Sequence, residues 1–260
     1  MTNLLEVKDL CVEVDGQELL HGVDLTIPDG EVHALLGPNG SGKTSLMMTV
    51  MGYPGYEVTR GHILFDGQDI TALNLTERAR LGLGVAQQRP PTIAGVKLQR
   101  ILDYAVAGDP QQAAEVNELV NAAHMEPFLD REVNANLSGG EIKRSELLQL
   151  LATRPRFAMM DEPDSGVDIE ALELVGDMLN ALFARDPAHP AKRRAGLIIT
   201  HTGHILDCVR ADKAHVMIEG RLACSGNPDL IFDTIRECGY EECARCIHRR
   251  EAGEGGGDVG

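Results

Sequence analysis

The spacing of apolar residues changes along the chain. In the first part, residues 4–14 and 23–36 are apolar and β-branched, and Asp-Gly pairs interrupt them at 15–16 and 29–30. Such runs, bounded by turn signals, predict β-strands. A further Asp-Gly pair at 66–67 predicts a hairpin over residues 61–70. The N-terminal part is therefore expected to be rich in β-strands.

Between about residues 76 and 155 the spacing becomes helical. Apolar residues fall at positions i, i+3, i+4 and i+7, the stripe of an amphipathic helix, at Val116, Leu119, Val120 and Ala123. Apolar strands follow at 157–160, 197–200 and 215–218, with a helical segment at 168–183 between them. Strands that alternate with helices indicate a mostly parallel sheet covered on both faces.

These changes of spacing predict one domain over residues 1–250. Its core is expected at about residues 1–79 and 156–237, with a helical subdomain of about 80–155 inserted between the two parts. Residues 238–250 form a cysteine-containing segment. The last residues, 251–260, are rich in glycine and have nothing to bury, which predicts a disordered tail.

Charge and composition restrict the classes of partner. The 260 residues carry a formal net charge of -16, and aromatic residues make up only 3% of them. An acidic surface repels nucleic acid, and scarce aromatics leave few platforms for base stacking. No apolar run approaches the ~18 residues of a membrane span. We therefore expect a cytoplasmic protein with no nucleic-acid partner and no direct membrane insertion.

A Gly-rich segment between a predicted strand and a predicted helix matches the pattern G-x-x-x-x-G-K-[ST] in full. In such a loop, backbone N–H groups converge on the β- and γ-phosphates, and the helix N-terminus adds its dipole. Lys43 supplies the cation that the acidic surface lacks, and the Thr44 hydroxyl suits Mg²⁺. The predicted contacts to ATP and Mg²⁺ are Gly37, Pro38, Asn39, Gly40, Ser41, Gly42, Lys43, Thr44 and Ser45. A Gly-rich turn without a ligand is the alternative.

The apolar strand at 157–160 ends in Asp161 and Glu162. Taken alone, this acidic pair is equally well a strand end that meets solvent. Beside a phosphate-binding loop it becomes a catalytic pair. Asp161 would hold the metal, directly or through water, and Glu162 is the candidate general base for the attacking water.

The segment Ser138-Gly139-Gly140-Glu141 precedes a predicted helix and fits S-x-x-E, an ordinary capping box. With Leu137 it reads LSGGE, and it lies between the phosphate loop and the acidic strand. Here the chain resembles the ABC ATPase family, whose LSGGQ signature occupies this place; Glu141 replaces the usual Gln. The resemblance implies that these residues contact ATP held by a second copy, in an ATP-dependent head-to-tail homodimer. A helix N-terminus with free N–H groups suits that role.

The same resemblance implies an α/β fold: a RecA-like P-loop core with an antiparallel β subdomain and an inserted helical subdomain. It places Gln88, or its neighbour Gln87, in a loop that senses metal and water. It places Asp168 just after the acidic pair, in the segment called the D-loop, and His201 against the γ-phosphate. Many members stack adenine on an aromatic residue. Residues 11–16 offer only Val14 in its place, so we expect apolar contact with the base.

Longer segments of the sequence narrow the resemblance to one group within the ABC ATPase family. LSGGEIKRSELLQ, DEPDSGVDIEAL and GYEVTRGHILFDGQDI are similar to the SufC group, the ATPases of SUF iron–sulfur cluster assembly, and the likeness spans about residues 4–240. It implies a scaffold partner similar to SufB and SufD. The alternatives are the ATP-binding subunit of a membrane ABC transporter and a nucleotide-regulated binding module with negligible turnover. An intact Glu162 argues against the binding module, where a base has no evident use.

Three of the six cysteines crowd near the C-terminus, at Cys238, Cys243 and Cys246. Their density is that of a zinc or iron–sulfur site, although four thiolates are the usual complement of such sites. The alternative to bound Zn²⁺ or an iron–sulfur cluster is a set of free thiols on a terminal helix.

Lys143 lies two residues beyond Glu141 on the same predicted helix. The resemblance to SufC-type ATPases implies that its ammonium group reaches Glu162. Such an ion pair would hold the carboxylate ionised and turned away from the attacking water. A solvated lysine on the helix face is the alternative.

Overall fold

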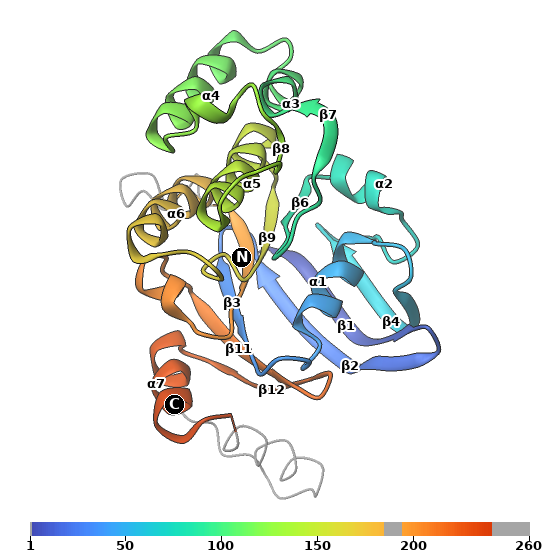
Figure 1. Cartoon of the computed structure of the whole chain (residues 1–260). Helices are drawn as coiled ribbons and strands as arrows, with labels where there is room; N and C mark the ends of the chain where they lie inside the picture. Colours follow the sequence, from blue (N-terminus) through green and yellow to red (C-terminus); the bar gives the residue numbers. More distant parts are fainter. Residues whose placement is uncertain (1, 185–193, 241–260) are drawn as a thin grey trace, which may run out of the picture.

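The computed structural model describes residues 2–184 and 194–240 (Figure 1). The expectations for most of the cysteine-containing segment and for the tail at 251–260 lie outside these ranges. The described residues form an α/β domain that contains two larger sheets, a two-stranded ribbon and seven α-helices. The expected α/β architecture is confirmed.

The smaller of the two main sheets is antiparallel and has the strand order β2-β1-β4-β5. Its strands are β1 (Asn3–Val14), β2 (Gln17–Pro28), β4 (Glu57–Phe65) and β5 (Gln68–Asp69). The Asp-Gly pairs make the tight turns that the sequence predicts. Asp15 and Asp66 both have φ of 51°, and the glycine after each is also left-handed, which two-residue hairpin turns require.

The larger sheet has the order β12-β11-β3-β10-β9-β6. Its strands are β3 (Val32–Leu36), β6 (Leu83–Ala86), β9 (Phe157–Asp161), β10 (Ala195–Ile199), β11 (Lys213–Ile218) and β12 (Arg221–Gly226). All neighbours pair in parallel except β12, which runs antiparallel to β11 at the edge. Every residue of β3, β9 and β10 is buried, as expected for strands covered on both faces.

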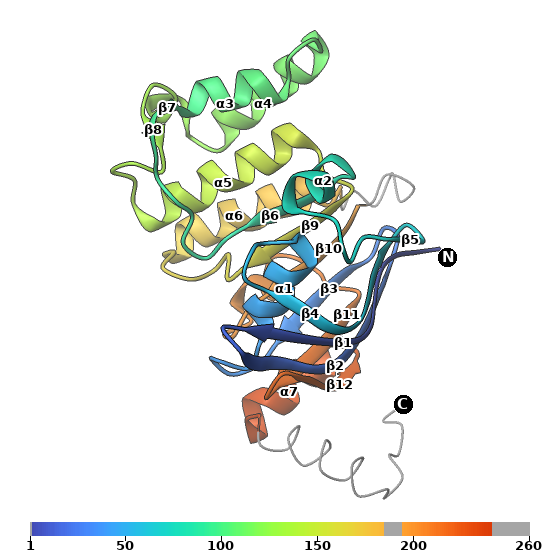
Figure 2. The same cartoon turned by 90° about the vertical axis from the view of Figure 1, so that its right-hand side faces the viewer.

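The helices are α1 (Lys43–Met51), α2 (Leu75–Arg80), α3 (Leu98–Ala105), α4 (Pro110–Ala122), α5 (Gly139–Thr153), α6 (Ile169–Leu182) and α7 (Pro228–Cys238). Helices α3, α4 and α5 gather at the end of the molecule farthest from β1 and β2, together with the ribbon β7 (Ile93–Lys97) and β8 (Glu132–Val133) (Figures 1 and 2). Short 3₁₀ helices cover Glu126–Phe128 and His204–Asp207. No helix within the described ranges is long and apolar enough to cross a membrane.

Alternate residues of the larger sheet enter different apolar cores. Met159 of β9 packs with α1 and the antiparallel sheet, whereas its neighbours Ala158 and Met160 pack with α5 and α6. This period of two places the sheet between two layers and explains why its central strands contain almost no polar residue.

The boundary of the insertion differs from the expected one. The sequence predicts a helical subdomain from about residue 80, but Leu83–Ala86 form β6 and pair in parallel with β9. This strand has only four residues and includes Gly84, so it shows neither the length nor the β-branched composition that identifies a strand in sequence. The core sheet therefore extends beyond residue 80, and the helices α3 to α5 follow β6.

The C-terminal ends of four parallel strands meet at one edge of the larger sheet. The Gly-rich loop follows β3, Gln88 follows β6, Glu162 follows β9, and His201 follows β10. In α/β folds this edge is where ligands bind. The topology therefore brings together residues that lie far apart in the sequence.

Candidate active site

Two glycines explain why the loop between β3 and α1 takes its shape. A Cβ on Gly37 would lie 2.2 Å from the backbone oxygen of Met217, so the loop could not approach β11 with any larger residue. Gly42 precedes α1 in a left-handed conformation, with φ of 102°. Both positions require glycine, and the loop leads directly into the N-terminus of α1.

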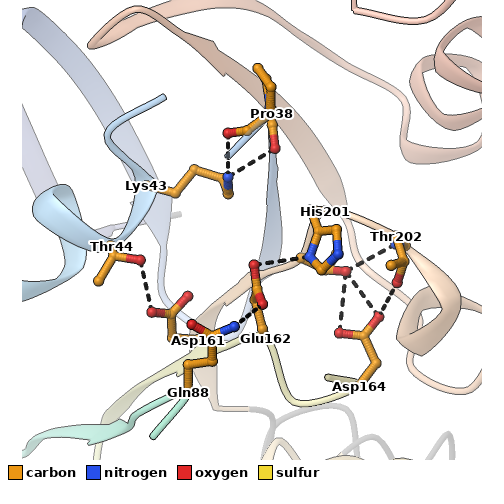
Figure 3. A network of polar contacts seen from close by, with 12 residues as sticks. Pro38, Lys43, Thr44, Gln88, Asp161, Glu162, Asp164, His201 and Thr202 are labelled. Atoms are coloured by element: carbon orange, nitrogen blue, oxygen red, sulfur yellow. Dashed lines mark hydrogen bonds and ion pairs between the residues drawn. The ribbon is translucent and has the colours of Figure 1, made fainter. Parts of the chain in front are cut away.

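Lys43 and Ser41 are held inside this loop. The Lys43 side chain is buried, and its Nζ donates to the carbonyl oxygens of Gly37 (2.8 Å) and Pro38 (2.9 Å), as Figure 3 shows for Pro38. Burial lowers the pKa of Lys43. The buried Ser41 hydroxyl has no hydrogen-bond partner within the part of the chain that the structure describes. An unsatisfied hydroxyl and a buried ammonium fit a bound polyphosphate, which would supply acceptors to both.

Thr44 and Asp161 come together at the base of the loop. The Thr44 Oγ1 donates to Asp161 Oδ2 over 2.8 Å. Burial raises the pKa of Asp161, and the bond from Thr44 opposes that rise. A hydroxyl and a carboxylate are hard oxygen donors, the ligand type that Mg²⁺ takes together with phosphate oxygens. The residues present therefore fit a nucleotide-bound Mg²⁺.

Glu162 occupies the centre of the candidate site (Figure 3). Its backbone is left-handed, with φ of 50°, an unusual conformation for a residue other than glycine. Gln88 Nε2 donates to its Oε2, and His201 Nδ1 lies 2.9 Å from its Oε1. The neighbouring Gln87 turns elsewhere and donates to the Tyr53 hydroxyl over 2.6 Å. Of the two adjacent glutamines, the structure thus brings Gln88 to Glu162.

A second acidic residue near Glu162 was not anticipated from the sequence. Asp164 accepts a hydrogen bond from Thr200 Oγ1 over 3.0 Å and another from Thr202 Oγ1 (Figure 3). These bonds fix the residues on both sides of His201. Hydroxyl residues on either side of a histidine at a strand end were the only signal in the sequence that could have pointed to this anchor.

These residues surround a pocket of about 540 Å³, within the range of ~300–1,000 Å³ typical of small-molecule sites. Its lining runs from Asn39 to Ser45 and includes Gln88, Glu162, Ser165 and His201. Leu19 of β2, which the sequence did not single out, provides an apolar wall. Val14 ends β1 and pairs with Gln17, outside this lining. A second hollow of about 550 Å³ lies over β4, away from the loop residues.

The signature segment starts α5. Ser138 accepts from the backbone N–H of Glu141, and the Glu141 carboxylate accepts from the Ser138 N–H over 2.7 Å, so the capping box is present. A Cβ on Gly139 would lie 2.5 Å from the Gly166 oxygen, which explains glycine there. Asp168 caps α6 by accepting from the Ala171 N–H over 2.8 Å. None of Ser138–Glu141 is among the described residues that line the pocket of their own chain.

The expected ion pair between Lys143 and Glu162 is absent, so that expectation is wrong for this structure. Both residues are described, and no nitrogen–oxygen pair between them falls within 4.0 Å. Lys143 is buried rather than solvated, and its Nζ donates to the backbone oxygens of Gln88 (3.1 Å), Gln87 (3.3 Å) and Asp161 (3.5 Å). Three backbone carbonyl groups, one of them that of Asp161, therefore satisfy the hydrogen-bonding capacity of the ammonium group.

The structure leaves the cysteine hypothesis open. Cys238 is exposed at the end of α7, whereas Cys243 and Cys246 lie outside the described residues. Within the described ranges there is no group of three His, Cys, Asp or Glu side chains arranged to hold a metal ion.

Comparisons with known proteins agree with this geometry. A family model described as ABC transporter matches residues 20–165, more than half of the chain. A probable ABC transporter ATP-binding protein of Streptococcus pyogenes serotype M18 is 39% identical, over 94% of this chain and 96% of its own. The probable ATP-dependent transporter ycf16 of Cyanophora paradoxa is 41% identical, over 88% and 90% of the two chains.

Two further matches agree with this family. Vegetative protein 296 of Bacillus subtilis is 39% identical over 87% of this chain and 88% of its own. The solved structure of an ATP-binding subunit of an ABC transporter covers 93% of this chain and 98% of its own, with a TM-score of 0.75 and 24% identity, which shows the shared fold. The chain belongs to the ABC transporter family and is an ATPase of the P-loop class.

Proposed function

We propose that this chain hydrolyses MgATP with Glu162 as the general base. The observation that carries the proposal is the position of Glu162 at the end of β9, in the lining of the P-loop pocket and in contact with Gln88 and His201. A carboxylate with those neighbours is placed to accept a proton from water near a γ-phosphate.

In this mechanism the P-loop amides and Lys43 hold the β- and γ-phosphates of ATP. Lys43 must first leave the carbonyl groups of Gly37 and Pro38, which it contacts in the structure. Water attacks the γ-phosphorus and gives its proton to Glu162, the bond to the ADP oxygen breaks, and ADP and phosphate leave. Gln88 orients the water, and His201 contacts the γ-phosphate.

Thr44 and Asp161 would hold Mg²⁺, with Gln88 as a further ligand, and the metal would neutralise charge on the phosphate oxygens. The hydrogen bond between Thr44 and Asp161 already places these two oxygen ligands side by side. We assign the apolar contact with adenine to Leu19, which lines the pocket; Val14, expected there from the sequence, lies outside that lining.

Two copies of the chain complete each site. Ser138 caps the N-terminus of α5, and two glycines follow it. These residues do not line the P-loop pocket of their own chain. Such a helix end offers N–H groups to an anion on another molecule. We therefore propose that Ser138, Gly139, Gly140 and Glu141 contact the γ-phosphate held by a second protomer, with Asp168 in the same interface.

We further propose that hydrolysis drives a conformational change in an iron–sulfur cluster assembly scaffold similar to SufB and SufD. The support is the run LSGGEIKRSELLQ, which resembles the SufC group and includes the polar residues Ser145 and Glu146 of α5. The second candidate function is that of the ATP-binding subunit of a membrane transporter. The Streptococcus and Cyanophora relatives are named as probable transporter proteins, which favours this second function.

Affinity purification of the tagged full chain, co-expressed with its neighbouring genes, separates the two candidates. The assembly function predicts a complex that is recovered without detergent and carries a brown iron–sulfur chromophore under anaerobic conditions. Recovery of an integral-membrane permease, with no scaffold in the detergent-free fraction, would replace it with the transporter function.

A further inference from the structure

One turn of α5 holds the backbone of the loop that carries Gln88. The Glu146 Oε2 accepts from the backbone N–H of Gln87 over 2.9 Å. From the preceding turn, Lys143 Nζ donates to the carbonyl oxygens of Gln87 (3.3 Å) and Gln88 (3.1 Å). Two side chains of opposite charge thus bind the donor and the acceptors of the same short backbone segment.

Burying these two charges costs free energy. Lys143 is 5% exposed, and the side chains beside the pair include the apolar Ala86, Leu147 and Met160. Burial lowers the pKa of Lys143 and raises the pKa of Glu146 to about 7. Their hydrogen bonds to the Gln87–Gln88 backbone offset part of this cost, because apolar residues in their place would leave those backbone groups unpaired.

The segment they hold is connected to the catalytic carboxylate. Gln88 donates from its side chain to Glu162, while Gln87 is fixed on its other side by Tyr53. Lys143 also reaches the backbone oxygen of Asp161, the residue before Glu162, at 3.5 Å. A shift of α5 would thus move Gln88 and, through it, the orientation of Glu162.

The opposite end of this helix is the signature segment, whose capped N-terminus is formed by Ser138. The helix is continuous from Gly139 to Thr153, so its N-terminus and the residues that bind the Gln87–Gln88 backbone belong to one rigid element. If a second molecule contacts that N-terminus and shifts it, the same helix would transmit the displacement to Glu162.

We propose that Glu146 and Lys143 form a clamp on the Gln87–Gln88 backbone, and that both are positioning residues through which α5 aligns Gln88 and Glu162 for hydrolysis. The proposal deepens the proposed function and rests on its assignment of Glu162 as the base. It is independent of whether the partner is an assembly scaffold or a permease.

A matched pair of substitutions tests the clamp. Glu146→Gln keeps a side-chain oxygen that accepts from the Gln87 N–H, whereas Glu146→Leu has similar size and no acceptor. Gln149→Ala, on the next turn of α5, is the control, because within the described residues the Gln149 side chain bonds only inside its own helix, to Ser145. The measurements on the full-length chain are hydrogen exchange at the Gln87 amide, ATP affinity, and kcat against KM.

The clamp predicts that Glu146→Leu speeds exchange at the Gln87 amide and lowers kcat by about tenfold or more, the loss expected when one backbone donor is left unpaired. ATP affinity should remain near wild type, because the P-loop is untouched. Glu146→Gln should restore both exchange and kcat, and Gln149→Ala should match wild type. If Glu146→Leu does not fold, Lys143→Met provides the same comparison from the other side of the clamp.

Wild-type kcat and amide exchange in Glu146→Leu would overturn the proposal, as would equal losses in Glu146→Leu and Glu146→Gln. Absence of ATP turnover in the wild-type chain would instead count against the proposed function. Amide exchange needs no ATP, so hydrogen exchange at Gln87 would still test whether Glu146 binds the Gln87 amide.

Discussion

His201 Nδ1 lies 2.9 Å from Glu162 Oε1, and the other oxygen of that carboxylate accepts from Gln88. Both oxygens of the proposed base are therefore engaged by side chains that follow β6 and β10, the two strands that flank β9 in the sheet. The same arrangement fixes the orientation of the carboxylate. A carboxylate offers about four lone-pair sites, so these two contacts leave acceptor positions for the attacking water.

Replacing Glu162 by Gln tests the base directly. The amide keeps the size and a hydrogen bond but cannot accept the proton, so kcat should fall roughly 10²–10⁴-fold. ATP binding should persist and the ATP-bound dimer should accumulate, which size-exclusion chromatography with light scattering would detect. Glu170→Gln, an exposed acid on α6, is the matched control. Near-normal hydrolysis in Glu162→Gln would move the role of base to His201 or to solvent.

Stability should depend on pH through Glu146. Burial raises its pKa from 4.5 to about 7, so the folded state binds this proton more tightly than the unfolded state. The resulting stabilisation is complete below pH 4.5 and is lost as the pH rises through 7. Glu146→Gln cannot ionise, so its free energy of unfolding should exceed that of wild type at pH 8 by at most about 3 kcal/mol, and by little at pH 4.5.

Urea unfolding at pH 4.5, 6 and 8 would measure this difference, with Glu118→Gln on the exposed surface of α4 as the control. A constant difference between Glu146→Gln and wild type across that range would contradict the raised pKa.

Motifs with a fixed local conformation could be predicted from sequence. The P-loop, the Ser138–Glu141 capping box and the Asp66-Gly67 turn each depend on a few adjacent residues, and each appears where it was expected. Contacts between distant segments could not be read in this way. Lys143 illustrates the limit, because its three carbonyl partners come from other strand ends that only the folded sheet brings to α5.

Short elements were missed for a related reason. Strand β6 is recognisable only through its pairing with β9, since four residues with a glycine carry no periodic signal. The choice between Gln87 and Gln88 likewise depended on side-chain direction. Adjacent residues of an extended segment point to opposite sides, and the sequence does not specify which side faces Glu162.

The metal content of the purified protein tests the role of the C-terminal cysteines. If Cys238, Cys243 and Cys246 bind Zn²⁺ or an iron–sulfur cluster, anaerobically purified protein should carry stoichiometric zinc or iron that a triple Ser variant loses. Elemental analysis with absorbance spectra would measure it, and Cys208→Ser would serve as the control. Metal content near zero, with three thiols alkylated freely, would identify them as free cysteines.

Each proposed active site combines the P-loop of one copy with the signature segment of another. Ser138→Arg should bind ATP and fail to hydrolyse it, because the bulky cation blocks the partner's γ-phosphate. Lys43→Ala should lose its own site but keep an intact signature. The steady-state ATPase rate of the two inactive variants mixed in equal amounts is the most direct measurement. Activity should return on mixing, through one complete site in each heterodimer; a mixture as inactive as its two components, or a strictly monomeric wild-type preparation that turns over at full rate, would contradict the shared site.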